Sequence, residues 1–236
     1  KAMFYSRNST LYKYDAGLLN DYDNHQAQNN TEHNLILFHL IGQHVNYGQR
    51  TPARAKHFKA EDYKTIRHDL GEKRRQTLAD YDNAVLYNDS IVDQIIERFK
   101  DKEAIVIYTP DHGEECYEGR RGFICRNHSS NIDYNLARYE FEIPFWIYTS
   151  PSYKAKHPEV FQQIVAAKDK KFMIDALPHL LLYLGGIHTK DYRDEHNILS
   201  KNYRENRPRI LKGTTDYDKL DRSKKELQVP LRKKKK

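Results

Sequence analysis

The chain has 236 residues and 38% hydrophobic content, which is enough for one sizeable core, so a single domain is the default expectation. No stretch approaches the roughly 18 consecutive apolar residues of a membrane span, and Lys1–Asn8 lack the apolar region of a signal peptide. Much of the net charge of +7 lies in Arg222–Lys236, and the rest of the chain is nearly balanced.

The first part of the chain is polar. Residues 1–33 are rich in Asn, Asp and Tyr, which predicts a loop-rich lead-in with a short helix around Tyr14–Tyr22. The apolar run Leu35–Leu40 then predicts a buried strand, in which His39 is expected to be a core histidine. Glycines and a proline mark residues 41–52 as a loop.

The middle of the chain predicts a helix, a strand and a loop. In Glu72–Lys100 the apolar residues recur mostly at steps of three and four, which indicates a long helix with one buried face. The run Ala104–Tyr108 predicts a second buried strand. Residues 114–136 follow as a long irregular loop, and loops of this length in compact domains are usually functional or disordered.

The last predicted elements are a strand over Phe141–Tyr148, which Pro144 weakens as a central strand, and a helix over Met173–Leu184 that ends at Gly185. Strands therefore alternate with helices, which predicts an α/β fold with a mostly parallel central sheet flanked by helices. The loops after Leu40 and Tyr108 would then open on the same edge of the sheet.

The strongest chemical signal is the sequence Asp111-His112-Gly113-Glu114, which follows the predicted strand 104–108. Ligands and catalytic groups collect at the carboxyl ends of strands in open α/β sheets. A carboxylate oxygen and an imidazole nitrogen both suit a zinc-like ion. The simpler interpretation is an aspartate that caps the following turn. Together with His44 in the other strand-end loop, the pair predicts a site at one edge of the sheet.

Two cysteines, Cys116 and Cys125, lie in the loop after this motif. They are either two reduced thiols or a small disulfide loop in an oxidising compartment. Two cysteines are too few for a zinc ribbon, which needs four ligands of this kind.

The lysine-rich end predicts a basic, disordered tail over residues 212–236. Such a tail could also bind an anionic membrane surface or nucleic acid, which would make the chain a non-catalytic basic binding module. RNA-binding signatures with interleaved aromatics and glycines are absent from the sequence, so no nucleic-acid partner is expected.

Several segments together resemble a known family. Phe38–His44 reads Phe-His-Leu-Ile-Gly-Gln-His and is similar to the His-x-x-Gly-x-His block of the sulfatase-like phosphoethanolamine transferases. Order and spacing agree with this family over residues 34–211, which predicts the C-terminal part of its catalytic domain. The other matching residues and segments are Tyr47, Arg50–Pro52, Tyr81–Asp89, Asp111–Glu114, Ile143–Phe145 and Arg207–Arg209.

The resemblance implies an enzyme of the alkaline phosphatase superfamily, with its catalytic domain in the bacterial periplasm and an anchor in the inner membrane. Such enzymes transfer phosphoethanolamine from phosphatidylethanolamine to lipid A or another envelope glycan, with zinc or another divalent metal and a threonine nucleophile. The alternatives are another sulfatase-like hydrolase or a phosphoglycerol transferase of the same superfamily. A monomer is expected, and the oxidising periplasm favours the disulfide.

Carried over by position, the resemblance makes Asp111 and His112 zinc ligands and places His44 on the substrate side. It makes His128 the histidine that follows the metal motif, and Glu114 a second-shell or substrate-amine contact. The residues after His44 depart from the family's His-Gly-Pro, and those after Glu114 depart from its Glu-Ser-Leu-Gly-Glu.

The family's nucleophile and first acidic zinc ligand lie well upstream of the His44 block, and only 43 residues precede His44 here. Thr10, Ser6 and Ser9 are not assigned as the nucleophile, because no strand is expected to lead into them. The chain alone is therefore expected to be inactive and to bind zinc poorly, since zinc sites normally have four ligands.

Overall fold

The computed structural model describes residues 2–7, 12–25, 31–118, 122, 124–126 and 131–223. The chain forms two compact units. Unit 1 comprises Lys1–Glu97, Glu114–Asn127 and Glu226–Lys236, and unit 2 comprises Arg98–Gly113 and His128–Lys225. Of the disordered tail predicted over residues 212–236, residues 212–223 are described and contain a short strand (Thr215–Asp216) and a 3-10 helix (Tyr217–Lys219), so the predicted start at residue 212 is wrong. Residues 224–236 lie outside the described residues.

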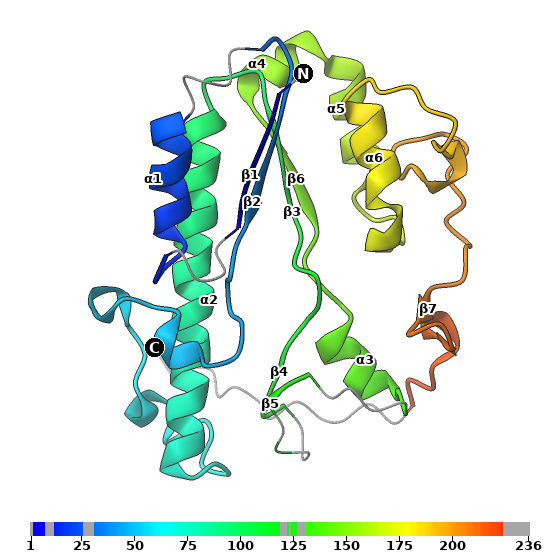
Figure 1. The fold of residues 1–236 in the computed structure, drawn as a ribbon. Coiled ribbons are helices and arrows are strands. Elements are labelled where there is room, and N and C mark those ends of the chain that lie inside the picture. The colour runs from blue at the N-terminus through cyan, green and yellow to red at the C-terminus, as the bar shows by residue number, and fades with distance from the viewer. Residues whose placement is uncertain are drawn as a thin grey trace, which may run out of the picture. The chain divides into compact units, whose positions relative to one another are not determined.

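Unit 1 begins with two parallel strands, β1 (Ala2–Arg7) and β2 (Asn34–His39), paired in register from Ala2–Asn34 to Arg7–His39. Helix α1 (Ala16–His25) connects them, and Figure 1 shows the two strands side by side. The sequence predicted α1 and β2 but not β1, so the loop-rich lead-in is corrected here. The strand reads Ala-Met-Phe-Tyr-Ser-Arg, a run too short and too close to polar residues to stand out, and its pairing with β2 is not visible in the local pattern.

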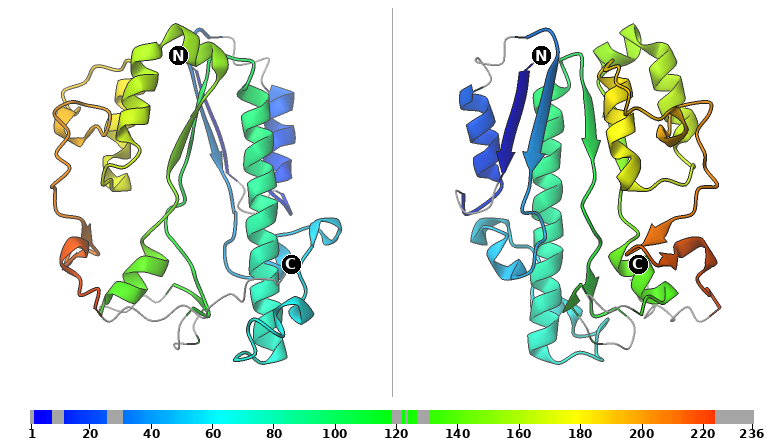
Figure 2. Two further views of the ribbon diagram at one scale, coloured as in Figure 1. Left: turned by 180° about the vertical axis from the view of Figure 1, so that it is seen from behind. Right: turned by 45° about the vertical axis from the view of Figure 1, so that its right-hand side comes forward.

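Helix α2 (Glu72–Phe99) confirms the helix predicted over 72–100, and Figures 1 and 2 show it as one long continuous helix. Its buried positions recur at helical spacing: Ala79, Asn83, Ala84, Asn88, Ile91, Val92, Ile95 and Phe99. Three short 3-10 helices precede it, η2 (Tyr47–Gln49), η3 (Ala53–Ala55) and η4 (Ala60–Tyr63).

Asn83 on α2 is fully buried and holds the chain that leads into η4. Its Oδ1 accepts hydrogen bonds from the backbone N–H of His57 (2.6 Å) and Phe58 (2.9 Å), and its Nδ2 donates to the Phe58 carbonyl (2.9 Å). We expect Asn83→Ala to lower the free energy of unfolding by about 1–3 kcal/mol, because it leaves buried backbone groups unpaired. Urea unfolding measures this, with Asp89→Ala at an exposed position of α2 as the control. Equal midpoints for the two variants would contradict the anchoring role.

Unit 2 contains an antiparallel pair, β3 (Ile105–Tyr108) and β6 (Trp146–Thr149), with Ile105 opposite Thr149. The strand predicted over 141–148 begins only at Trp146, because Pro144 cannot donate to a ladder. Four helices accompany the pair, α3 (Tyr134–Glu140), α4 (Pro151–Lys156), α5 (Pro158–Ala167) and α6 (Leu177–Leu184). Short 3-10 helices η5 (Ile174–Ala176), η6 (Asp194–His196) and η7 (Tyr217–Lys219) complete it.

Unit 2 buries a core in which Leu180 of α6 is fully enclosed. Three residues from the strand pair pack against this core: Ile107 of β3, Ile147 of β6, and Phe145, which directly precedes β6. These contacts attach the two strands to the helices. The core explains why the apolar run 104–108 becomes a strand, since each of its side chains is at least partly covered.

The predicted mostly parallel central sheet is not confirmed. In the described part of the chain, β1 and β2 pair parallel, whereas β3–β6 and two short hairpins pair antiparallel. The hairpins are β4 (Glu115–Cys116) with β5 (Ile124–Cys125) and β7 (Ile210–Leu211) with β8 (Thr215–Asp216). An apolar run shows that a strand exists but not in which direction its neighbour runs.

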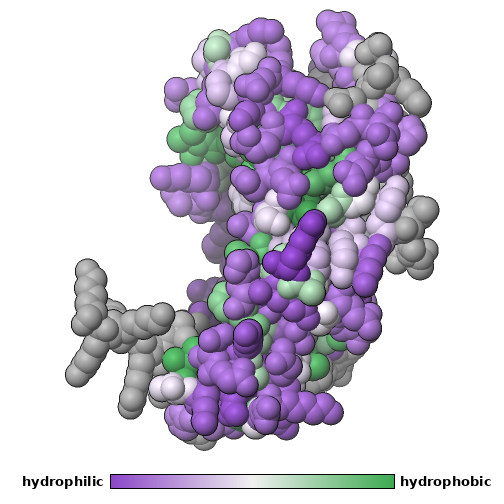
Figure 3. Space-filling model, turned by 90° about the vertical axis from the view of Figure 1, so that its left-hand side faces the viewer, coloured by the Kyte–Doolittle hydropathy of each residue, from purple (hydrophilic) through white to green (hydrophobic). Residues whose placement is uncertain are grey.

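The surface agrees with the composition. On the face drawn in Figure 3, hydrophilic residues predominate and hydrophobic ones form small separate groups. Among the described residues, no helix has the combination of length and apolar character needed to cross a membrane.

Candidate functional site

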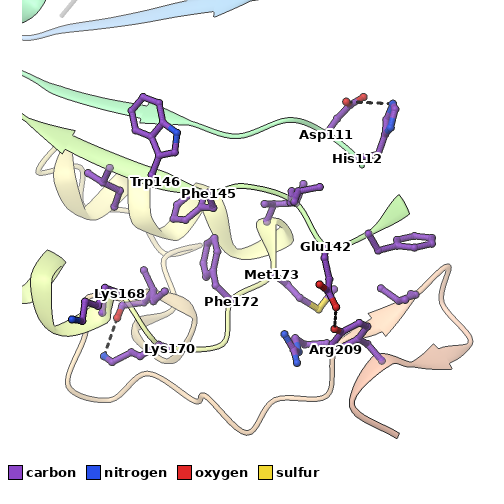
Figure 4. Close-up of a pocket in the computed structure, with 18 of the residues that line it drawn as sticks. Asp111, His112, Glu142, Phe145, Trp146, Lys168, Lys170, Phe172, Met173 and Arg209 are labelled. Atoms are coloured by element: carbon purple, nitrogen blue, oxygen red, sulfur yellow. Dashed lines mark hydrogen bonds and ion pairs between the residues drawn. The ribbon is translucent and has the colours of Figure 1, made fainter. Parts of the chain in front are cut away.

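Asp111 and His112 lie just beyond the C-terminal end of β3, as predicted. His112 Nε2 is 3.5 Å from Asp111 Oδ1, and Figure 4 shows the two side chains facing each other. His112 Nδ1 is 2.6 Å from the Gly113 carbonyl oxygen and donates its proton there. Nε2 is therefore the ring nitrogen that faces the carboxylate and could bind a metal ion.

These two atoms fit a zinc ion. Ligands about 2.0–2.1 Å from a tetrahedral zinc lie about 3.4 Å from each other, close to the separation of Nε2 and Oδ1. A histidine that binds metal usually donates its other N–H to a carbonyl or carboxylate, as His112 does to Gly113. Within the described residues, no group of three or more His, Cys, Asp or Glu side chains could hold a metal.

Gly113 is required for a reason the sequence did not predict. A side chain at this position would overlap the Tyr139 carbonyl oxygen and lie 3.2 Å from the Glu140 carbonyl carbon. The Gly113 N–H donates to the Glu140 carbonyl at 2.9 Å. The glycine therefore allows the metal motif to lie directly against the end of α3.

A cavity of about 570 Å³ in unit 2 includes Asp111 and His112 in its lining. Much of the lining is apolar and overlaps the core: Phe145, Trp146, Ile147, Ile164, Phe172, Met173 and Ile198 (Figure 4). Of its charged residues, Lys170 donates to the Ile198 carbonyl and Arg209 makes two hydrogen bonds to Asp218. We interpret the cavity as a loosely filled part of the core with the candidate metal ligands at its edge.

His44 lies in unit 1, in the loop that follows β2, and is exposed. Its backbone N–H donates to the Ile41 carbonyl at 3.2 Å, and its carbonyl accepts from Arg50 Nε at 2.9 Å. His39, at the end of β2, is also exposed, so the expectation of a core histidine is wrong. Only one face of β2 is partly covered, and His39 points to the other.

Glu114 belongs to unit 1 and is held by a residue from the His44 loop. Its Oε1 accepts a 2.6 Å hydrogen bond from the hydroxyl of Tyr47, which is buried. Burial raises the pKa of that hydroxyl well above its ordinary value, and the bond to Glu114 raises it further. His128, the remaining predicted site residue, lies outside the described residues.

Cys116 and Cys125 are free thiols in the structure, and the disulfide favoured from the sequence is absent. In the β4–β5 hairpin Cys116 is opposite Ile124 and Cys125 is opposite Glu115. The two thiols therefore occupy adjacent, not facing, positions of the ladder, where side chains alternate between faces. Burial raises the pKa of both thiols, which keeps them protonated.

Three residues that shape the His44 loop were missed by sequence reasoning: Asp15, Tyr47 and Arg50. Asp15 was read as part of a polar lead-in, whereas Tyr47 and Arg50 were noted only as part of the block that resembles the family and were given no structural role. No local pattern identifies them, because their partners lie far along the chain or are backbone atoms.

Comparison with known proteins identifies the family of the chain. The family model described as "Sulfatase" matches residues 2–186, well over half of the sequence. The chain belongs to the sulfatase family. The match includes β2, α2, β3 and the Asp111-His112 pair, so the resemblance drawn from the motifs is confirmed.

Individual relatives and solved structures also match the chain. Phosphoethanolamine transferase EptC of Escherichia coli O18:K1:H7 is 29% identical over 221 residues, 91% of this chain and 37% of the relative. Kdo(2)-lipid A phosphoethanolamine 7''-transferase of Salmonella typhimurium is 33% identical over 153 residues, 64% of this chain and 25% of the relative. The zinc-complexed C-terminal periplasmic domain of EptC from Escherichia coli matches with TM-score 0.71 and 26% identity, over 93% of this chain and 61% of that one. The chain thus spans only 25–37% of the length of these two curated relatives.

Proposed function

We propose that this chain is part of a zinc-dependent enzyme that transfers phosphoethanolamine from phosphatidylethanolamine to lipid A or another envelope glycan. The observation that carries the proposal is the pairing of His112 Nε2 with Asp111 Oδ1 at a zinc-compatible 3.5 Å. Relatives that match most of this chain are named phosphoethanolamine transferases, and one matching structure is a zinc complex.

Asp111 and His112 supply two of the zinc ligands in this proposal. Zinc, when bound, polarises a phosphoryl oxygen and lowers the pKa of a hydroxyl nucleophile. The other ligands and the threonine nucleophile come from polypeptide outside this chain, so the chain alone is expected to be inactive and to bind zinc weakly. Gly113 contributes the carbonyl that keeps the His112 Nδ1 proton in place.

The other site residues act on the substrate. His44 and His128 stabilise charge on the transferring group or protonate the leaving alkoxide. Glu114 accepts a hydrogen bond from the ammonium group of the ethanolamine. The exposure of His44 supports a role toward a substrate that arrives from solvent.

The setting is the periplasmic face of a bacterial inner membrane, where the enzyme works as a monomer. The matching structures are described as C-terminal periplasmic domains, and one relative from Neisseria meningitidis as an integral membrane protein. We also propose that the intact domain has the mostly parallel central sheet of the alkaline phosphatase superfamily, of which β1 and β2 are a parallel part.

The test is mass spectrometry of lipid A and other envelope glycans from a strain that lacks its own phosphoethanolamine transferases and expresses the full-length protein. A phosphoethanolamine adduct that depends on the protein supports the proposal. Release of sulfate from an aryl sulfate, or a phosphoglycerol adduct without phosphoethanolamine, would assign the protein to another branch of the superfamily.

We expect His44→Ala to lower the transfer rate about 100-fold, because it removes a proton donor or charge-stabilising group from the reacting centre. Zinc content should not change, since His44 is not one of the proposed ligands. Steady-state transfer and zinc analysis on the full-length protein measure both. His33→Ala, at another exposed histidine of unit 1, should retain full activity. Loss of zinc from the His44 variant would show that the role assigned here is wrong.

A further inference from the structure

The loop that carries His44 is fixed at its start by a buried charge. The Asp15 carboxylate, 4% exposed, accepts hydrogen bonds from the backbone N–H of Ile41 (3.0 Å) and Gly42 (2.9 Å). A carboxylate that accepts two backbone N–H groups holds them in one geometry, and such charge-assisted bonds are about twice as strong as neutral ones. The exit from β2 is therefore rigid.

The same loop is fixed again around His44. Arg50 Nε donates to the His44 carbonyl (2.9 Å), and Arg50 Nη2 donates to the Val45 carbonyl (2.7 Å). Asn46 then adopts a left-handed conformation, φ 72°, which turns the chain into η2. The backbone on both sides of the His44 side chain is thus held by side chains of its own unit.

Tyr47, the first residue of η2, connects this rigid loop to Glu114. Its ring is 3% exposed and meets the Tyr81 ring edge-on at 5.1 Å, so its position is fixed by packing. Its hydroxyl donates to Glu114 Oε1 at 2.6 Å. A donor fixed by packing thereby orients the Glu114 carboxylate.

We propose that Tyr47 is a positioning residue, which sets the orientation of the Glu114 carboxylate relative to the His44 loop. The inference rests on the proposed function, in which Glu114 binds the ethanolamine ammonium group. An ammonium donor needs a carboxylate held in one direction, and a carboxylate free to rotate loses that preorganisation. Tyr47 has this effect without touching the substrate itself.

The test is Tyr47→Phe in the full-length protein, with transfer kinetics at varied phosphatidylethanolamine and zinc analysis. We expect kcat/KM to fall about 10- to 100-fold with zinc content unchanged. Tyr63→Phe is the matched control, because Tyr63 is also buried in unit 1 and its hydroxyl also donates to a carboxylate, that of Asp82. The control should keep wild-type kinetics at a similar cost in stability.

A double-mutant comparison separates positioning from packing. If Tyr47 acts through Glu114, Tyr47→Phe combined with Glu114→Gln is no slower than Glu114→Gln alone. Additive losses, or kinetics of Tyr47→Phe equal to those of Tyr63→Phe, would overturn the inference. A wild-type protein without phosphoethanolamine transfer would instead defeat the proposed function, so the two failures are distinguishable.

Discussion

Asp111→Ala in the full-length protein is expected to remove most of the bound zinc and nearly all transfer activity. The substitution deletes Oδ1, which lies 3.5 Å from His112 Nε2, and leaves a lone imidazole in place of a two-donor pair. The loss should exceed the roughly 10- to 100-fold effect of removing a partner that only supports a ligand. Metal analysis after dialysis and transfer kinetics measure both quantities, and His112→Ala should behave in the same way.

The control for these variants is His188→Ala, at an exposed histidine of unit 2, which should change neither zinc content nor rate. Zinc occupancy and transfer rates of both ligand variants at the wild-type level would refute the ligand assignment. Loss of activity with full zinc occupancy would instead make the pair substrate-binding groups.

Gly113→Ala is expected to have the second-largest effect, although it removes no chemical group. The added methyl group would overlap the Tyr139 carbonyl oxygen, so the end of α3 or the metal motif must shift. Overpacking of this kind costs about 1–3 kcal/mol of stability. The shift also disturbs the carbonyl that accepts the His112 Nδ1 proton, so zinc affinity should fall together with stability.

Urea unfolding and zinc titration of the Gly113 variant measure the two effects. Gly71→Ala is the control, because nothing lies within 4 Å of a side chain added there. Wild-type stability in the Gly113 variant would show that the contact with Tyr139 relaxes without cost.

The sequence was sufficient for elements with strong periodicity and for the position of the Asp111-His112 pair at the end of a strand. Helix α2 was predicted within one residue at its end, because its apolar residues repeat over many turns. Strand β3 and the location of Asp111-His112 after it followed from one apolar run and the residues at its end. The helix and the strand were predictable because each depends on residues close together in the sequence.

The remaining features depend on partners far along the chain. β1 is a strand because it pairs with β2, some 30 residues later in the chain. Neither the sequence of β3 nor that of β6 indicates that the two strands run antiparallel. The bond from Tyr47 to Glu114 spans 67 positions, and nothing in the residues around Tyr47 predicts that partner. The positions of the two thiols in the β4–β5 ladder likewise depend on register, which the spacing of Cys116 and Cys125 did not specify.

Because Asp111 and His112 are consecutive residues, the distance between their donor atoms is governed by one peptide unit and a few side-chain torsions. Rearrangement of helices elsewhere in the molecule can therefore move and reorient this pair as a unit, but cannot separate its two donor atoms widely. If the pair binds zinc as proposed, the surrounding loops can change without altering the spacing of these two ligands.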